Sequence, residues 1–504
     1  MKFLKKQSFK EGIFSSTLLN IFAKGLQFLN TILIAYYFGA SAGTDLYYFT
    51  IAIVLLISSL INNLDVVALI PEFIRLKENS GEKKAFGFLN LYIFLYAIIG
   101  LLILIVSFLS NNNALASFFN VSQQTIIDNA LYIKLASILP LLMLITNLFS
   151  AISNAYNYFA VPVLINLINS VIVFLVILIF HYAMGPMAGI VAMLVGYSIN
   201  IAILLYILLV KINWQFGAVH ISLTKELRTT ILVSYFTTIP ITLRNYMTAY
   251  LFNGLGNGVL TAVNWGQQLA GLPDVFITTQ VLNITSIKFS EYYAKQKIKD
   301  AYQLFYSIAG YLFIILFITA AISIIYASQI ITLLMSRGSF DKDKAAITIV
   351  IFALLSALPF INLLPMLTGR LFIAFQLLKK TTFITTVSHI IITVILYVGI
   401  KYYGYWGFGV GSIIGYFIQS LLYVYITNKN FEGIRLIAIM YKIIKPILVF
   451  FTISVLLYFI NTYLVSIQLS ILSLLVGLFA YGAMLIKIYY VEILSTISNF
   501  KHKN

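Results

Sequence analysis

The feature that most constrains this chain is a succession of apolar segments, each long enough to cross a bilayer. A membrane-spanning helix needs about 20 predominantly apolar residues. Fourteen segments of the 504-residue sequence meet this criterion: 16–38, 46–71, 86–110, 129–154, 161–182, 187–210, 228–253, 259–287, 303–328, 345–370, 382–401, 406–427, 443–462 and 467–488. Backbone polar groups in lipid must be satisfied internally, so each segment is predicted to be a helix. The sequence therefore predicts an all-α polytopic membrane protein.

Composition supports this prediction and excludes several kinds of site. Hydrophobic residues make up 61% of the chain and charged residues 9%, whereas a soluble domain is about half apolar and about a quarter charged. The chain has no cysteine, which excludes disulfides, cysteine-ligated zinc and iron–sulfur clusters. The histidines are too scattered to indicate a metal site, and they are His181, His220, His389 and His502.

The distribution of basic residues predicts the orientation. If the N-terminus is cytoplasmic, 24 of the 32 lysines and arginines lie in or at the borders of the N-terminal tail, the even-numbered loops and the C-terminus, and four lie in or at the borders of the odd-numbered loops. The remaining four, Lys24, Lys134, Arg244 and Arg370, are assigned to apolar segments. This asymmetry follows the positive-inside rule, so both termini are expected in the cytoplasm. The segment 110–128 and the loop around Arg337 to Lys344 are then exterior. The net charge of +17 does not indicate nucleic-acid binding, because no water-facing domain is predicted.

The N-terminus resembles a signal peptide at first sight, since lysines precede an apolar run. The run Thr17 to Phe38 is too long for a signal-peptide core and lacks a clear small-residue cleavage site. We therefore expect it to remain as the first helix.

An internal repeat indicates two related halves. Gly185 and the segment 196–200 (GYSIN) recur as Gly404 and the segment 415–419 (GYFIQ), at an offset of 219 residues. Six helices per copy is an even number, so the second copy would enter the membrane from the same side as the first. The expected organisation is two pseudo-symmetric six-helix lobes around a central cavity, followed by two extra C-terminal helices. The expected domains are the N-lobe (1–215), the C-lobe (216–430) and helices 13 and 14 with a cytoplasmic tail (431–504).

Basic residues within the apolar segments are the first candidates for function. A charge near the bilayer centre costs about 2.5 to 3.5 kcal/mol on insertion scales, so such residues should face a bundle interior or an aqueous cavity. Lys24 is followed by Gln27, Asn30 and Thr31 at helical spacing, which predicts a polar stripe lining a cavity. The alternative is a lysine that extends to the cytoplasmic interface. Arg244 is the counterpart of Lys24 in the second half.

The environment of the remaining candidates leaves more than one interpretation open. Arg244 follows Pro240, and a proline within a span frees backbone groups and permits bending. Arg244 is either a cavity ligand or part of a structural ion pair. Asp65 and Asp274 could pair with a cation, bind a coupling ion or be protonated. Asp45 opens the second span, where we expect it to cap a helix N-terminus.

The sequence shows no motif of a common enzyme class. It lacks the metalloprotease, phosphate-binding-loop and nucleophile-elbow patterns. We therefore expect a transporter with no cofactor, driven by the membrane potential or an ion gradient.

Several short motifs resemble those of a known family. They occur in the order and spacing typical of MurJ/MviN-type lipid II flippases of the MOP superfamily, and they are 38–40 (FGA), 44–45 (TD), 70–71 (IP), 154–162 (NAYNYFAVP), 264–273 (NWGQQLAGLP), 337–341 (RGSFD) and 358–359 (LP). The resemblance covers residues 15 to 430. It implies fourteen helices, two six-helix lobes around a central cavity, and two additional helices.

The departures from that family concern the residues expected to hold the substrate. The resemblance implies two arginines on helix 1, where this chain has Lys24 and Asn30, and one on helix 8, where it has Gln268. In helix 2, Ala52 replaces an expected arginine, and Asn62 an acidic residue, with Asp65 one turn later. A guanidinium can bind phosphate bidentately and an ammonium cannot. The headgroup is therefore held differently, or it is a different headgroup.

The function expected from the resemblance is that of a flippase in the bacterial cytoplasmic membrane. Its substrate would be a polyprenyl-pyrophosphate-linked oligosaccharide, either lipid II or a related glycan, contacted by Lys24, Asn30, Arg244 and Gln268. Asp65 and Asp274 would serve in coupling or ion pairing. Expected partners are this lipid, membrane lipids and envelope-synthesis enzymes, but not nucleic acid. Two alternatives stay open: a cation-coupled multidrug antiporter of the same superfamily, and a scaffold that transports nothing.

Overall fold

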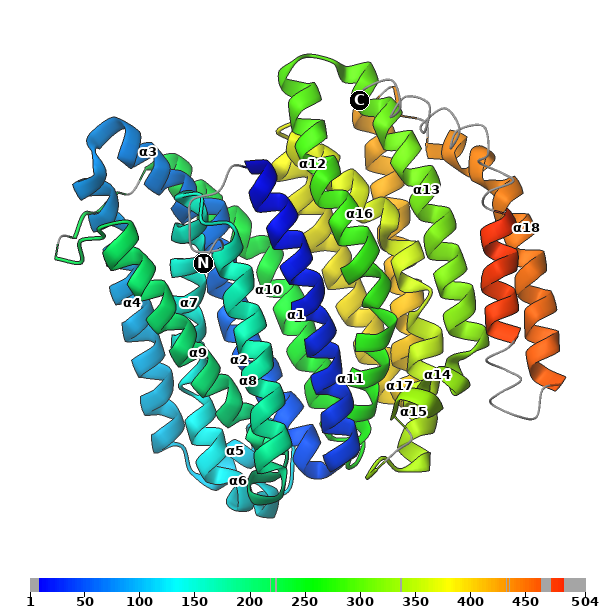
Figure 1. Cartoon of the computed structure of the whole chain (residues 1–504), viewed down its shortest axis with the longest axis horizontal. Coiled ribbons are helices and arrows are strands. Elements are labelled where there is room, and N and C mark those ends of the chain that lie inside the picture. Colours follow the sequence, from blue (N-terminus) through cyan, green and yellow to red (C-terminus); the bar gives the residue numbers. More distant parts are fainter. Residues whose placement is uncertain are drawn as a thin grey trace. The chain divides into compact units, whose positions relative to one another are not determined.

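The computed structural model describes residues 9–217, 219–222, 224–335, 338–431, 433–434, 436–463 and 473–484 (Figure 1). Within these ranges every regular element is helical. Before residue 212 the elements are α1 (Phe9–Phe38), α2 (Ala42–Leu64), η2 (Asp65–Leu69), α3 (Ile70–Ser80), α4 (Glu82–Leu109), α5 (Asn112–Phe119), α6 (Gln123–Ala136), α7 (Leu139–Ala155), α8 (Ala160–Met184), η3 (Gly185–Met187), α9 (Ala188–Tyr206) and η4 (Ile207–Lys211). After it they are α10 (Lys225–Asn253), α11 (Val259–Ala270), η5 (Asp274–Thr278), α12 (Thr279–Ala294), α13 (Ile298–Ile325), α14 (Ala327–Met335), α15 (Lys342–Leu355), α16 (Leu358–Ala374), α17 (Leu378–Asn430), α18 (Leu436–Tyr463) and a short apolar helix, Ser473–Met484.

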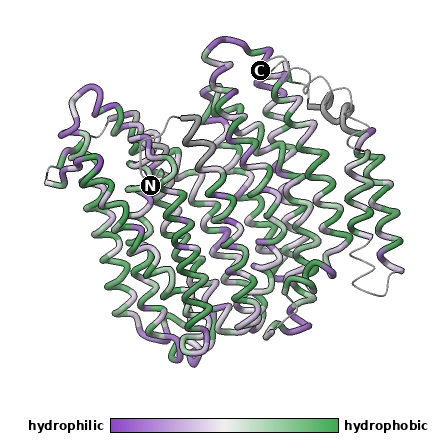
Figure 2. Tube along the Cα trace, viewed as in Figure 1, coloured by the Kyte–Doolittle hydropathy of each residue, from purple (hydrophilic) through white to green (hydrophobic). Residues whose placement is uncertain are grey.

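The predicted spans coincide with these helices. The first thirteen lie on α1 through α18, and the fourteenth, 467–488, falls within the described part only over Ser473–Met484. Two continuous apolar runs, Ala160–Lys211 and Leu378–Asn430, each contain two predicted spans. The all-α polytopic fold is therefore confirmed. Figure 2 shows hydrophobic residues along the helices and hydrophilic ones gathered in the segments that connect them.

Two predicted spans in the second half, α10 and the pair α11 and α12, are more polar than the others that are described. Eight other described segments are long and apolar enough to cross a membrane, and these two spans are not among them. Both carry residues that the sequence singled out, Arg244 on α10 and Gln268 on α11. Polarity along a span is expected where a helix lines a polar interior.

The repeat seen in the sequence is present in the backbone. Gly185 ends α8 with φ 56° and ψ −150°, and Gly404 bends α17 with φ 57° and ψ −137°. This backbone region is accessible almost only to glycine, because a Cβ atom would clash with the chain. Both glycines therefore turn the chain in the same way between consecutive apolar helices, at the predicted offset.

A second pair of related features lies in the second and eighth predicted spans. A π-helical turn starts at Asp65 in η2, and another starts at Asp274 in η5. Such turns are rare and are found frequently at functional sites. Each places a carboxyl group at an interruption of the regular helix.

The chain forms two compact units. The first comprises Met1–Asn264, Met335–Lys344 and Thr385–Tyr405, and the second comprises Trp265–Leu334, Ala345–Ile384 and Trp406–Asn504. In the first, α1 packs against α8, α9 against α7 and α8, and α10 against α2. In the second, α13 packs against α16 and α18, and α12 against α16. The predicted lobe boundaries stay a prediction.

Candidate functional site

Lys24 lies half-buried on α1. Its ammonium donates a hydrogen bond to Oε1 of Gln27 at 3.0 Å, one turn further along the helix. It forms no ion pair with any side chain in the described ranges. Lys24 is therefore a basic side chain within an apolar span that has no acidic partner among the described residues.

Asn30 has a structural partner on another helix. Only 7% of the residue is exposed, and its Nδ2 donates to the carbonyl oxygen of Ser170 on α8 at 3.0 Å. This bond holds α1 against α8. The sequence placed Asn30 on one polar stripe with Lys24, but the structure directs Lys24 and Gln27 toward each other and Asn30 into a helix interface.

Arg244 is held by a histidine. Its Nη1 lies 3.0 Å from Nδ1 of His389 on α17, which is 8% exposed. A guanidinium can only donate, so Nδ1 of His389 accepts and its imidazole is neutral in this contact. The pair leaves the charge of Arg244 in place and fixes its orientation. Gln268, in the second unit, is exposed on α11.

Asp65 is completely buried. Its exposed fraction is 0%, and its Oδ1 accepts a hydrogen bond from the hydroxyl of Tyr96 on α4. Its other oxygen, Oδ2, is buried without a hydrogen-bond partner. Asp274 is half-buried, and its Oδ1 is also buried without one.

Asp45 caps a helix, but not its own. The N-terminus of α2 is capped by Ser41 together with Thr44. The carboxylate of Asp45, 3% exposed, instead accepts from the backbone N–H of Gly258 and from the N–H and hydroxyl of Thr261, the latter two at 2.8 and 2.7 Å. Thr261 lies in the first turn of α11 and Gly258 directly precedes it, where the helix provides no partners for these N–H groups. Asp45 thus ties α2 to α11.

Further contacts join the two halves of the sequence at this end of α1. The N–H of Ser339 donates to the carbonyl oxygen of Tyr36 at 2.9 Å, and the hydroxyl of Ser339 donates to the carbonyl oxygen of Tyr37 at 3.1 Å. The approach is so close that a Cβ atom on Gly39 would lie 2.1 Å from the carbonyl oxygen of Ser339. Only glycine therefore fits there. Arg337, which precedes this segment in the sequence motif, lies outside the described residues.

The segment 110–128 also contacts the second half. Sequence reasoning treated it as a polar loop, but it contains α5, whose N-terminus is capped by Asn111. The side chain of Asn253 donates to the carbonyl oxygen of Phe119 at 2.8 Å, and that of Asn120 donates to the carbonyl oxygen of Tyr250 at 2.9 Å. We use the name α5 end for the region that contains α5, Asp45, Ser339 and the residues that they contact.

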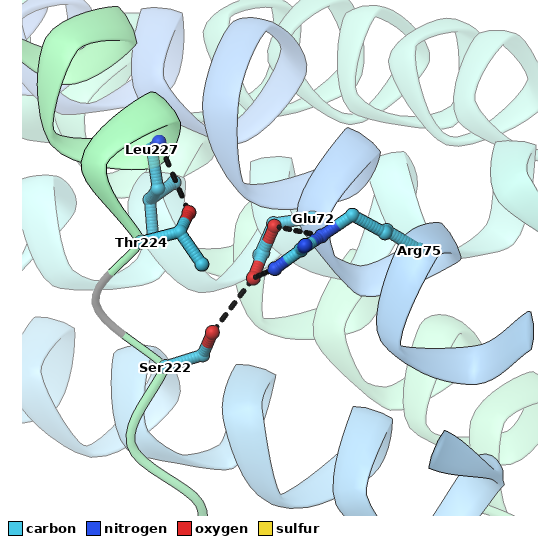
Figure 3. Close-up of polar contacts among 5 residues, drawn as sticks. All are labelled: Glu72, Arg75, Ser222, Thr224 and Leu227. Atoms are coloured by element: carbon cyan, nitrogen blue, oxygen red, sulfur yellow. Dashed lines mark hydrogen bonds and ion pairs between the residues drawn. The ribbon is translucent and has the colours of Figure 1, made fainter. Parts of the chain in front are cut away.

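A polar cluster lies on α3 (Figure 3). Glu72 accepts hydrogen bonds from Nε and Nη2 of Arg75 at 2.8 and 2.7 Å, and from the hydroxyl of Ser222 at 2.7 Å. Burial opposes ionisation of Glu72, but these bonds outweigh it and lower the pKa below its ordinary value. Thr224, close by in the chain, caps α10 through the N–H of Leu227. Glu72 thus anchors the segment that leads into α10.

Basic side chains, and no group of metal ligands, stand out within the described spans. Among the described residues, no group of three or more histidine, aspartate or glutamate side chains could hold a metal ion. Lys24 and Arg244 supply positive charge on spans of the first unit. Sequence reasoning missed Tyr96 and His389, the partners of two of its candidates, because neither stands out among 34 tyrosines and scattered histidines.

Comparison with known proteins identifies the family. A family model described as lipid II flippase MurJ matches residues 34–479. Among solved structures, the chain is similar to lipid II flippase MurJ in an inward closed conformation, with a TM-score of 0.77 and 16% identity, over 95% of this chain and 99% of that one. None of the curated protein sequences matches this chain significantly.

More distant structural similarity extends to the wider superfamily. An inward-facing multidrug resistance MATE family transporter of the MOP superfamily gives a TM-score of 0.66 at 14% identity, over 81% of this chain and 96% of that one. A MOP superfamily transporter from Pyrococcus furiosus, described as having a binding pocket of reversed polarity, gives 0.59 at 16% identity, over 84% and 95%. At these identities the structures show a shared fold. Because the family model spans most of the 504 residues, this protein belongs to the MurJ lipid II flippase family.

Proposed function

We propose that this protein carries a polyprenyl-pyrophosphate-linked oligosaccharide, lipid II or a close relative, outward across the bacterial cytoplasmic membrane. The family supports the class of substrate. The observation that carries the proposal is Lys24, an ammonium within a membrane span whose hydrogen-bond partner is a neutral amide. An anionic headgroup is the ligand that would offset the cost of holding this charge in the membrane.

Arg244 supplies the second cation of this proposal. Its hydrogen bond to Nδ1 of the neutral His389 imidazole orients the guanidinium without cancelling its charge. The substrate-binding set remains Lys24, Asn30, Arg244 and Gln268, with Asn30 acting mainly through the contact of α1 with α8. No catalytic step and no cofactor enter the proposal, because the lipid is moved and not chemically changed.

Alternating access would use the contacts of the α5 end. Asp45, Ser339 and the residues around α5 tie segments of the first half to α10, α11 and the segment before α15. With both termini in the cytoplasm this end is exterior, so these contacts close the exterior side. They must break for the headgroup to leave.

The membrane potential would supply the driving force. Moving one charge through 100 mV is worth about 2.3 kcal/mol. An inside-negative potential favours outward movement of an anionic headgroup. If Lys24 and Arg244 neutralise it, the loaded carrier moves nearly uncharged, and the empty, positive carrier is drawn back toward the inside.

The proposal is tested by glycan exposure in proteoliposomes with an imposed potential and with pH and sodium clamped. Exposure is measured with an impermeant reagent that modifies only outward-facing headgroups. Lys24→Gln should abolish exposure, Lys24→Arg should retain part of it, and Lys134→Gln, which removes a cation lying over the ring of Phe108, serves as the matched control. Normal exposure by a Lys24→Ala, Arg244→Ala double variant would refute the anion site. Efflux of cationic dyes without glycan exposure would instead favour the multidrug antiporter.

A further inference from the structure

Asp65 has the geometry of a site for a single small ligand. Oδ1 accepts a hydrogen bond from the hydroxyl of Tyr96, while Oδ2 is buried and has no hydrogen-bond donor among the described residues. No basic side chain of the described residues forms an ion pair with it. An ionised carboxylate buried with one hydrogen bond is costly, whereas a protonated one is neutral.

The surroundings of Asp65 favour a proton over a metal ion. A metal ion needs several ligands, and the described residues contain no group of three or more acidic or histidine side chains that could hold one. A proton needs a single oxygen atom, and Oδ2 of Asp65 provides it. The titratable neighbours are tyrosines: Tyr96 itself, with Tyr92 on α4 and Tyr235 on α10 close enough to interact with it. Glu72 on α3 interacts with Tyr92 but already has Arg75 as its partner, and α7 contains no titratable residue.

One of the helices packed against the turn that holds Asp65 comes from the second half of the sequence. The π-helical turn η2 packs against α10 as well as against α2, α3 and α7. The helix α10 contains Pro240, which weakens its hydrogen bonding and permits bending. A movement of α10 away from η2 would therefore open a path from Asp65 to water.

We propose that Asp65 binds one exchangeable proton, which it holds while η2 is packed against α10 and releases when they separate. The proton adds to Oδ2 of the carboxylate, so binding raises the net charge by one and needs no other reactant. This rests on the proposed function only in that α10 must move during transport. It adds a proton to the charge balance of each cycle.

Infrared spectroscopy tests proton binding without any substrate. Spectra of the full-length protein in liposomes should show the C=O stretch of a protonated carboxyl group, which shifts in D₂O. The band should be absent in Asp65→Asn and move to higher frequency in Tyr96→Phe, where one hydrogen bond to the carboxyl group is lost. Glu72→Gln is the matched control, because Glu72 is also buried but is ionised beside Arg75, and it should leave the band unchanged.

Transport then tests release. The rate of glycan exposure should depend on pH in the native protein and become independent of it in Asp65→Asn, with about one proton released per turnover in weakly buffered liposomes. A missing carboxyl band, or an unchanged pH profile in Asp65→Asn with exposure intact, would overturn the proton site. A normal band with no glycan exposure would leave the site standing and count against the proposed function.

Discussion

Asp45 satisfies the backbone donors of a helix to which it does not belong. Asp45→Asn keeps the shape but turns an amide NH₂ toward the N–H groups of Gly258 or Thr261, leaving a buried donor unsatisfied. Such a loss costs about 1 to 3 kcal/mol. We expect a clear drop in the thermal unfolding temperature of the purified protein for Asp45→Asn, and a small one for Thr261→Ser, which keeps the hydroxyl. Equal unfolding temperatures for both variants and the native protein would contradict this role.

Glu72 should make stability depend on acid. Its pKa is below the ordinary value of 4.5 in the folded protein, so its contribution is complete above about pH 4.5 and is lost as the pH falls below that value. Glu72→Gln should be less stable by about 1 to 2 kcal/mol at neutral pH, because bonds to a charged group are lost. The difference should shrink in acid, where Glu72 is itself protonated.

The control for this prediction is the ion pair of Lys77 and Glu82, at 3.0 Å, in which Glu82 is exposed. Exposed pairs contribute little, so Glu82→Gln should change thermal unfolding far less. A gap between Glu72→Gln and the native protein that stays constant down to low pH would show that the carboxylate charge is not responsible.

At the scale of elements, Gly185 and Gly404 determine how consecutive apolar helices connect. Alanine at either position would have to adopt a positive φ that costs about 1 to 3 kcal/mol. Gly310 lies in regular helix with free space where a Cβ would be, so Gly310→Ala should be neutral or stabilising by up to about 1 kcal/mol. Thermal unfolding of the three alanine variants measures this contrast. A loss as large at Gly310 would mean that the backbone conformation is not the cause.

The helices could be predicted from the sequence because membrane spans follow from length and apolarity alone. The interruptions could not. The π-helical turns at Asp65 and Asp274 do not change the hydropathy pattern, and α5 lies in a stretch whose composition is typical of a polar loop. The candidate charges could be found because they are rare in apolar segments, but their partners could not, since tertiary packing selects Tyr96 and His389 from many similar residues.

At the scale of the whole molecule, orientation in the membrane is the prediction on which the transport direction depends. The cysteine-free chain allows single cysteines at exposed positions on α3 and α5, for example Ser80→Cys and Asn113→Cys. In intact cells an impermeant thiol reagent should label Asn113→Cys at once and Ser80→Cys only after permeabilisation. The reverse pattern would place the α5 end in the cytoplasm and reverse the proposed mechanism.

The contacts of the α5 end share a property with an evolutionary consequence. Apart from the bond between the hydroxyl of Thr261 and Asp45, each of them has a main-chain group as a partner: the N–H of Gly258, the N–H of Thr261, and the carbonyl oxygens of Tyr36, Tyr37, Phe119 and Tyr250. A main-chain group is present whatever the side chain, so substitution at Phe119 or Tyr250 leaves the bonds intact, whereas Gly258 is restricted by its positive φ and by the carbonyl oxygen of Ala40. Pairs such as Asn120 and Tyr250, or Asn253 and Phe119, should therefore show little correlated substitution among relatives, although their atoms are in direct contact.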